Sequence, residues 1–156
     1  MISMISSVGK NRELGKKNDL IWQFKEDMKF FKNTTMGHTV VMGFNTYKSL
    51  PGDLPGRHII VVSFEEVPGV DTAYGIDEIV DKYKDSEEEI FICGGASIYT
   101  QFLPYAKKLY LTEIDAFDDE ADTFFPEFDK ANYTKEILDQ KECNDIKFDI
   151  CLYELK

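Results

Sequence analysis

The sequence has few of the residues that build metal sites and disulfide frameworks. Three cysteines and two histidines occur among its 156 residues, and no cysteine pair has the close spacing of metal ligands. An odd number of scattered cysteines, Cys93, Cys143 and Cys151, is typical of buried, reduced thiols in a cytoplasmic protein. The sequence therefore predicts neither a metal site nor a disulfide bond.

Long apolar runs are also absent, and none approaches the length of a membrane span. The first eight residues are apolar, but this stretch is too short for a signal peptide. Its nearest cations, Lys10 and Arg12, follow it instead of preceding it. We therefore expect no association with a membrane.

Positive charge is scarce, because 18 lysines and arginines stand against 29 acidic residues, for a net charge of −11. Such a chain repels phosphate backbones, which argues against a broad nucleic-acid interface. Apolar residues at 43% and aromatic residues at 13% are enough for one sizeable core. We expect residues 1–156 to form a single domain that acts as a monomer.

Short apolar runs alternate with helical patterns over the first two thirds of the chain. The runs predict strands at residues 2–8, 39–42, 59–63 and 90–93, each covered on both faces. Helices are expected at residues 24–36, 45–50, 76–83 and 96–103. Segments 108–114, 133–140 and 147–155 alternate in polarity, as antiparallel edge strands do, and acidic runs at 87–89 and 115–122 indicate solvated loops. This order predicts an α/β fold with a mainly parallel sheet and antiparallel strands at its C-terminal end.

Asp27 is the most informative single residue. It lies in a predicted helix beside Met28 and four residues before Phe31, so its carboxylate projects close to an apolar stripe. Such surroundings disfavour the charged form of a carboxyl group. The group could act as an acid, or accept two hydrogen bonds from an amidine-like ligand edge. The alternative is an exposed carboxylate paired with Lys29 or Lys32.

Three other features could be functional or merely structural. Gly94-Gly95 lies between a predicted strand and a helix, where backbone can approach a ligand and free N–H groups can bind phosphate. Arg57 follows a turn and opens a strand, so it could bind a carboxylate or simply lie on the surface. Trp22, the only tryptophan, precedes the Asp27 helix and could equally belong to the core.

Nine short segments together carry a resemblance that no one of them carries alone. They are residues 1–5, Leu14-Gly15 with Leu20, Trp22, Asp27 with Phe31-Lys32, 41–43 with Thr46, 54–57, 94–99, 109–115 and 122–126. In this order and spacing they resemble the dihydrofolate reductase family over essentially the whole chain.

The resemblance implies a central eight-stranded sheet with four flanking helices. It also implies reduction of 7,8-dihydrofolate to 5,6,7,8-tetrahydrofolate by hydride transfer from NADPH, in support of one-carbon metabolism and thymidylate synthesis. The implied catalytic residues are Asp27, which would bind the 2-amino and N3 edge of the pterin, Thr112, which would support it, and Trp22, which would hold a water molecule. Antifolate-type small molecules are expected to bind at the same place.

The implied substrate pocket has an apolar wall and two polar contacts. Arg57 would bind the glutamate carboxylate, and the backbone of Ile5 and Cys93 would meet the other amino edge of the pterin. The side chains implied to line the ring and benzoyl pocket are Met28, Phe31, Leu50 and Leu54.

The resemblance further implies an NADPH site, with a cis peptide at Gly94-Gly95 and a loop at residues 15–20 that closes over the nicotinamide. The residues matching that site are Ser6, Ser7, Leu14, Gly15, Asn18, Asp19, Leu20, Gly43, Phe44, Asn45, Thr46, Ser63, Phe64, Cys93, Gly94, Gly95, Ala96, Ser97, Ile98 and Tyr99.

Four positions depart from the pattern of the family. Ile21 replaces the usual proline before the tryptophan, which leaves the geometry of the loop open. Phe44, Phe64 and Ser97 stand where many members place polar or basic residues around the adenosine 2′-phosphate. Lys48, one turn beyond Phe44, or a lysine from elsewhere in the fold could supply a cation there. We therefore expect a weaker preference for NADPH over NADH than is usual in the family.

Two other functions remain open for such a sequence. The first is a reductase of another pterin or a pyrimidine on the same fold, as in riboflavin synthesis. Asp27, Thr112 and Arg57 argue against it, because a ribityl-phosphate substrate needs neither an amidine acceptor nor a carboxylate clamp. The second is a non-catalytic acidic binding module, which would not oxidise NADPH in the presence of dihydrofolate.

Overall fold

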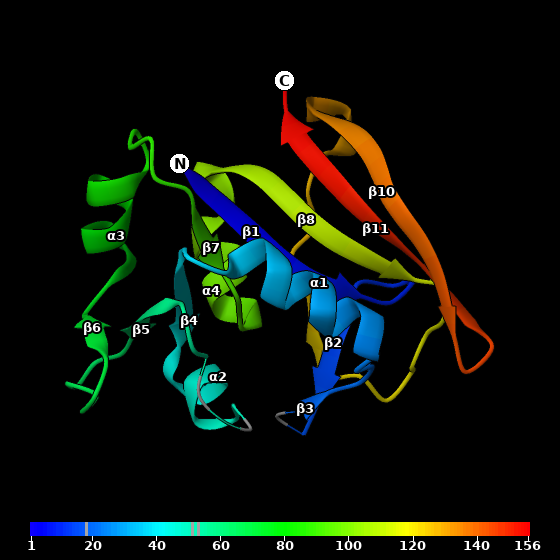
Figure 1. The fold of residues 1–156 in the computed structure, drawn as a ribbon, viewed down its shortest axis with the longest axis horizontal. Helices are drawn as coiled ribbons and strands as arrows, with labels where there is room; N and C mark the ends of the chain where they lie inside the picture. The colour runs from blue at the N-terminus through cyan, green and yellow to red at the C-terminus, as the bar shows by residue number, and fades with distance from the viewer. Residues whose placement is uncertain (18, 51, 53) are drawn as a thin grey trace.

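An eight-stranded sheet runs through the molecule in the order β10-β11-β8-β1-β7-β4-β5-β6 (Figure 1). The computed structural model describes residues 1–17, 19–50, 52 and 54–156. The strands are β1 (Ile2–Val8), β4 (Thr39–Gly43), β5 (His58–Val62), β6 (Asp71–Ala73), β7 (Ile90–Ile92), β8 (Ala106–Ile114), β10 (Tyr133–Cys143) and β11 (Ile146–Leu155). Pairs from β8 through β6 are parallel, whereas β11 is antiparallel to both β8 and β10. The predicted sheet, mainly parallel with antiparallel C-terminal strands, is confirmed.

The direction of β8 corrects one prediction. Segment 108–114 was expected to be an antiparallel edge strand, but β8 pairs in parallel with β1 and is antiparallel only to β11. After β7, the crossover through α4 (Ala96–Phe102) returns the chain to the end of the sheet at which β7 begins. The next strand, β8, therefore runs parallel to β7 and to β1. The hairpin of β10 and β11 then supplies the edge.

Four helices cover the two faces of the sheet, as predicted. They are α1 (Lys25–Thr35), α2 (Phe44–Lys48), α3 (Ile76–Tyr83) and α4, and short 3-10 turns follow at η1 (Leu103–Tyr105) and η2 (Lys130–Asn132). Side chains of one face, such as Ile5, Val40 and Phe91, pack with Phe30 and Phe31 of α1. The alternate side chains of the same strands pack in a second cluster with α3 and α4. The strands are therefore apolar on both faces, which is why their sequences show continuous apolar runs.

A second sheet of three short strands was not predicted. Its order is β3 (Asp19–Leu20), β2 (Glu13–Lys16) and β9 (Thr123–Phe124). Strands of two to four residues contain too few positions to show a periodic pattern, and their pairing joins segments more than 100 residues apart. This small sheet joins Glu13–Lys16 and Asp19–Leu20 to the segment that follows β8.

The acidic runs and the cysteines differ in solvent exposure from what the sequence predicts. Glu89 is half-buried and accepts a hydrogen bond from Ser3 at 2.6 Å, so the run at 87–89 is only partly solvated. Asp118 is likewise half-buried within the run at 115–122. Cys151 is buried as predicted, whereas Cys93 and Cys143 are half-buried; all three are free thiols.

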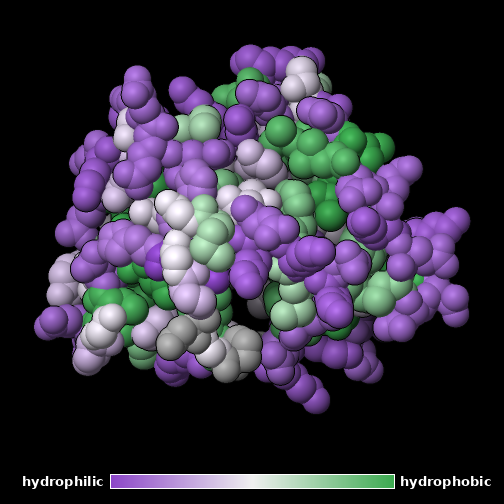
Figure 2. Space-filling view, viewed as in Figure 1, coloured by the Kyte–Doolittle hydropathy of each residue, from purple (hydrophilic) through white to green (hydrophobic). Residues whose placement is uncertain are grey.

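Hydrophilic residues cover most of the face seen in Figure 2, which is hollowed between α1 and the segment around α2.

In the described part of the chain the longest helix, α1, has 11 residues, and no helix combines the length and apolar character that crossing a membrane requires.

Candidate active site

Three elements bring polar side chains together at Asp27. Ser7 in β1 and Thr112 in β8 are register partners in adjacent parallel strands, so their side chains point to the same face of the sheet. Asp27, in the first turn of α1, lies over both. Thr112 donates its hydroxyl to Asp27 Oδ1 at 2.5 Å, and the Ser7 hydroxyl donates to Oδ2. The structure thus joins Asp27 to Thr112 as the resemblance implies and adds Ser7, which was expected only at the coenzyme.

The environment of Asp27 favours proton uptake. Burial raises the pKa of this carboxyl group, although the hydrogen bonds from Ser7 and Thr112 partly oppose the rise. Lys29 and Lys32, the alternative partners, are exposed on α1. Each oxygen of Asp27 has one hydroxyl donor and retains a lone pair for a ligand. Asp27 can therefore accept two further hydrogen bonds and hold a proton above the usual pH range of an aspartate.

An apolar wall lies on the same face of the sheet. Five residues implied for the substrate pocket belong to one packed cluster there, namely Ile5, Phe31, Leu50, Leu54 and Cys93. Met28, the sixth, is 54% exposed and lies outside that cluster. Burial raises the pKa of the Cys93 thiol to about 12, so this side chain remains neutral.

Arg57 is anchored at the far end of α1. Its Nη1 donates to Thr35 Oγ1 at 3.4 Å, and its Nε donates to the Pro55 carbonyl at 3.2 Å. Arg57 lines a groove of about 940 Å³ together with Leu50 and Leu54. Arg57 is half-buried, and these two hydrogen bonds orient its guanidinium. Thr35 was missed from the sequence, because a threonine near a helix end carries no signal of a partner 22 residues away.

Trp22 is half-buried above Gly9 and packs against the cluster of Phe24, Ile114 and Phe148. A Cβ atom added to Gly9 would lie only 2.7 Å from Cη2 of the indole, so this glycine allows the close approach of the ring. The tryptophan therefore has both a structural contact and an accessible surface.

The glycine pair forms a cradle at the carboxyl ends of β4 and β7. Gly94-Gly95 is a cis peptide, as the resemblance implies, and Gly94 has a φ of 119°. The Gly94 carbonyl accepts a hydrogen bond from the Gly43 N–H at 2.9 Å. Cβ atoms at Gly94 and Gly95 would lie 3.6 and 3.4 Å from Thr46 Oγ1 and would fill the space beside it. Bare backbone next to a hydroxyl donor suits the pyrophosphate of a dinucleotide.

Three other residues expected at the coenzyme contribute little side-chain surface. Leu14, Ile98 and Tyr99 have side chains in the core, and the Tyr99 hydroxyl donates to the Ile5 carbonyl at 2.7 Å. Asp19 and Leu20 form β3 and are exposed. The remaining expected positions are Ser6, Gly15, Asn45, Ser63, Ala96 and Ser97; Asn18 lies outside the described residues, as do Pro51 and Asp53 near the predicted turn.

Two exposed aromatic rings follow neighbouring strands. Gly43 and Val62 are register partners at the ends of β4 and β5, so Phe44 and Phe64 lie at the same edge of the sheet. Phe44 is 40% exposed and Phe64 is 99% exposed. Lys48 Nζ lies 4.8 Å from the centroid of the Phe44 ring, and Lys48 also lines the groove that contains Arg57.

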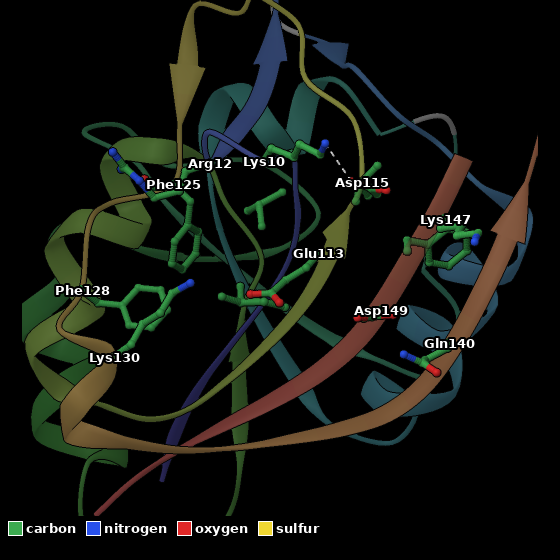
Figure 3. A pocket seen from close by; sticks show the side chains of 15 residues that line it. Lys10, Arg12, Glu113, Asp115, Phe125, Phe128, Lys130, Gln140, Lys147 and Asp149 are labelled. Carbon is green, nitrogen blue, oxygen red and sulfur yellow. Dashed lines mark hydrogen bonds and ion pairs between the residues drawn. The ribbon is translucent and has the colours of Figure 1, made fainter. Parts of the chain in front are cut away.

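A second hollow, of about 540 Å³, contains none of the expected site residues (Figure 3). It includes Glu113, which points to the opposite face of β8 from Thr112 because adjacent strand residues alternate. Glu113 accepts hydrogen bonds from Lys135 at 2.8 Å and the Tyr153 hydroxyl at 2.6 Å. Burial raises its pKa, but these bonds outweigh that effect and lower it overall. These bonds tie β8 to β10 and β11.

Comparison with known proteins gives three relatives and one family model with the same description. A family model described as dihydrofolate reductase matches residues 1–155. The dihydrofolate reductase of Bacillus subtilis is 37% identical over 162 positions, covering 100% of this chain and 95% of that protein. That of Staphylococcus haemolyticus is 36% identical, covering 96% and 93%. A solved structure of dihydrofolate reductase from Enterococcus faecalis, complexed with NADP(H) and RAB-propyl, has 27% identity and a TM-score of 0.89, covering 100% and 96%.

Proposed function

This chain belongs to the dihydrofolate reductase family, and we propose that Asp27 binds its substrate and supplies the proton for the reaction. The protein is an NADPH-dependent oxidoreductase that reduces 7,8-dihydrofolate to 5,6,7,8-tetrahydrofolate. The observation that carries the proposal is a half-buried carboxyl group held by Thr112 and Ser7 beside an apolar wall.

Substrate binding begins at the Asp27 carboxylate. Its two oxygens accept hydrogen bonds from the 2-amino group and N3 of the pterin, while Thr112 and Ser7 keep the carboxylate in plane. Because burial raises the pKa of Asp27, the carboxylate can take up a proton from water, and in this protonated form it delivers the proton toward N5, with Trp22 holding a water molecule on the route. Bound NADPH supplies the hydride that C6 of the pterin receives.

The remainder of the substrate runs from Asp27 past the apolar wall to Arg57. Phe31, Leu50 and Leu54 pack against the rings and exclude water from them. Arg57 then pairs with the glutamate carboxylate, and Thr35 holds its guanidinium in place. The backbone of Ile5 and Cys93 contacts the other amino edge of the pterin.

The coenzyme fits the cradle at the glycine pair. Gly94-Gly95 and Thr46 would hold the pyrophosphate, and the loop at residues 15–20 would close over the nicotinamide. At the adenosine end Phe44 would stack on the adenine and Lys48 would meet the 2′-phosphate. One flexible lysine in place of several fixed cations supports a weaker preference for NADPH over NADH than is usual in the family.

We propose a monomeric protein in which residues 1–156 form a single domain around one eight-stranded sheet. The cytoplasm is the proposed compartment, consistent with three free thiols. Antifolate-type molecules are proposed to bind at Asp27 through the same amidine-like edge.

The decisive experiment is to follow the loss of NADPH absorbance after dihydrofolate is added. We expect turnover with dihydrofolate and none with a ribityl-phosphate pyrimidine. Turnover of the pyrimidine alone would favour the other reductase. An absence of NADPH oxidation with either substrate would favour a binding module.

A further inference from the structure

A buried carboxylate joins two loops that lie far apart in the sequence. Glu13 begins β2 and is only 1% exposed. Its Oε1 accepts a hydrogen bond from the Asn11 backbone N–H at 2.7 Å. Its Oε2 accepts one from the Asp118 backbone N–H, also at 2.7 Å. One side chain thus bridges the turn before β2 and the segment that follows β8.

Burial makes the charge of Glu13 unfavourable unless other groups compensate for it. Across the described ranges, its hydrogen-bond donors are the two backbone N–H groups, and it takes part in none of the ion pairs. Bonds from N–H groups to a carboxylate are strengthened by its charge. Both loops must therefore be in place together for Glu13 to be satisfied.

The bridge lies directly beside Trp22. A Cβ atom on Gly9 would lie 2.5 Å from Glu13 Oε1 and 2.7 Å from Cη2 of Trp22. The carboxylate and the indole therefore pack over the same glycine, so a displacement of Glu13 changes the support of the ring.

Further contacts tie the same two segments together around Glu13. The Asp122 N–H donates to the Gly15 carbonyl at 3.0 Å. Lys10 forms an ion pair with Asp115 at 2.9 Å, drawn as a dashed line in Figure 3. Exposed pairs of this kind contribute little, whereas the buried Glu13 bonds are shielded from water and salt. Glu13 is therefore one of several links between the segments, and water and salt weaken its buried bonds little.

We propose that Glu13 is a positioning residue for coenzyme binding and hydride transfer. It holds β2 and the Trp22 ring against the segment after β8, and it touches neither reactant. The inference rests on the proposed function, in which Trp22 holds a water molecule on the proton route and the loop that continues from β2 closes over the nicotinamide. A carboxylate is required because both of its oxygens are acceptors, whereas an amide has one acceptor and one donor.

The substitution Glu13→Gln tests this role, since it preserves size but turns an NH₂ group toward a backbone N–H. We expect the single-turnover rate of hydride transfer to fall about tenfold and the Kd for NADPH to rise by a similar factor. The Kd for dihydrofolate without coenzyme should stay within about twofold, because Asp27 and its hydroxyl partners are unchanged. Quenching of the Trp22 fluorescence reports both titrations.

Glu113→Gln is the matched control. Glu113 is a half-buried carboxylate that also accepts two hydrogen bonds, but it lies on the face of β8 opposite to Thr112. It should lower the melting temperature but leave hydride transfer and both dissociation constants unchanged. Equal weakening of both ligands by Glu13→Gln, or an unchanged hydride-transfer rate, would overturn the inference. If the wild-type protein is active, either outcome overturns only the role of Glu13. If the wild-type protein does not oxidise NADPH with dihydrofolate, the proposed function is overturned as well.

A second measurement needs no variant. Amide hydrogen exchange in the wild-type protein should show the N–H groups of Asn11 and Asp118 opening together, and more slowly when NADP⁺ is bound. Independent exchange of the two groups, unaffected by NADP⁺, would contradict the proposed bridge.

Discussion

Replacing Asp27 with asparagine removes one acceptor and the acidic proton while preserving the size of the side chain. Loss of one charge-assisted hydrogen bond, worth about 1.5–3 kcal/mol, lowers kcat/KM about tenfold to a hundredfold. Loss of a positioned general acid typically lowers the rate by about 10² to 10⁴. Because both effects act through one group they are not additive, and we expect Asp27→Asn to lower kcat/KM by about 10² to 10⁴ at neutral pH.

The assay is the rate at which NADPH absorbance falls with dihydrofolate. Glu26→Gln is the matched control, because Glu26 occupies the same first turn of α1 but is exposed. That variant should retain nearly full activity. A rate for Asp27→Asn within a few-fold of the wild type, or an equal loss in Glu26→Gln, would refute the role of Asp27.

The pKa of Asp27 also sets the direction of two pH effects. Burial raises this pKa above its ordinary 3.8. At pH values between 3.8 and the raised pKa, Asp27 is therefore protonated in the folded protein but ionised in the unfolded chain. The contribution of Asp27 to the free energy of unfolding therefore falls as pH rises through that window. Asp27→Asn should raise the melting temperature more at neutral pH than below pH 3.8. Wild-type activity should fall as pH rises above the raised pKa; activity that rises instead would contradict the acid role.

The other predictions concern Arg57, which would bind the glutamate tail of the substrate, and the residues proposed to bind the adenosine end of the coenzyme. Arg57→Leu should raise the KM for dihydrofolate by about tenfold or more with little change in kcat, and a substrate without the glutamate tail should be insensitive; equal effects on both substrates would indicate a structural role. Lys48→Met should lower the affinity for NADPH about tenfold and leave that for NADH unchanged, whereas Phe44→Ala should weaken both coenzymes in fluorescence titrations. A wild-type preference for NADPH above about a thousandfold that collapses in high salt would show that further cations bind the phosphate.

Local pattern was enough to predict the parallel core and its helices. Strands buried on both faces must be continuously apolar, and α1 must present an apolar stripe to the sheet, so these features are visible in short windows of sequence. The same pattern placed Asp27 beside the stripe, and the family resemblance named Thr112 as its partner. The cis peptide at Gly94-Gly95 followed from the resemblance, not from any local pattern.

The other features of the site depend on which distant segments the fold brings together. Ser7 and Thr112 meet at Asp27 only because β1 and β8 are aligned in parallel, a relation between positions 105 residues apart. The parallel direction of β8 likewise depends on where the α4 crossover returns the chain. Glu13 is charged, and charge in a sequence indicates solvent exposure. Its burial is stabilised by backbone N–H groups of distant segments, and backbone groups leave no trace in the amino-acid sequence.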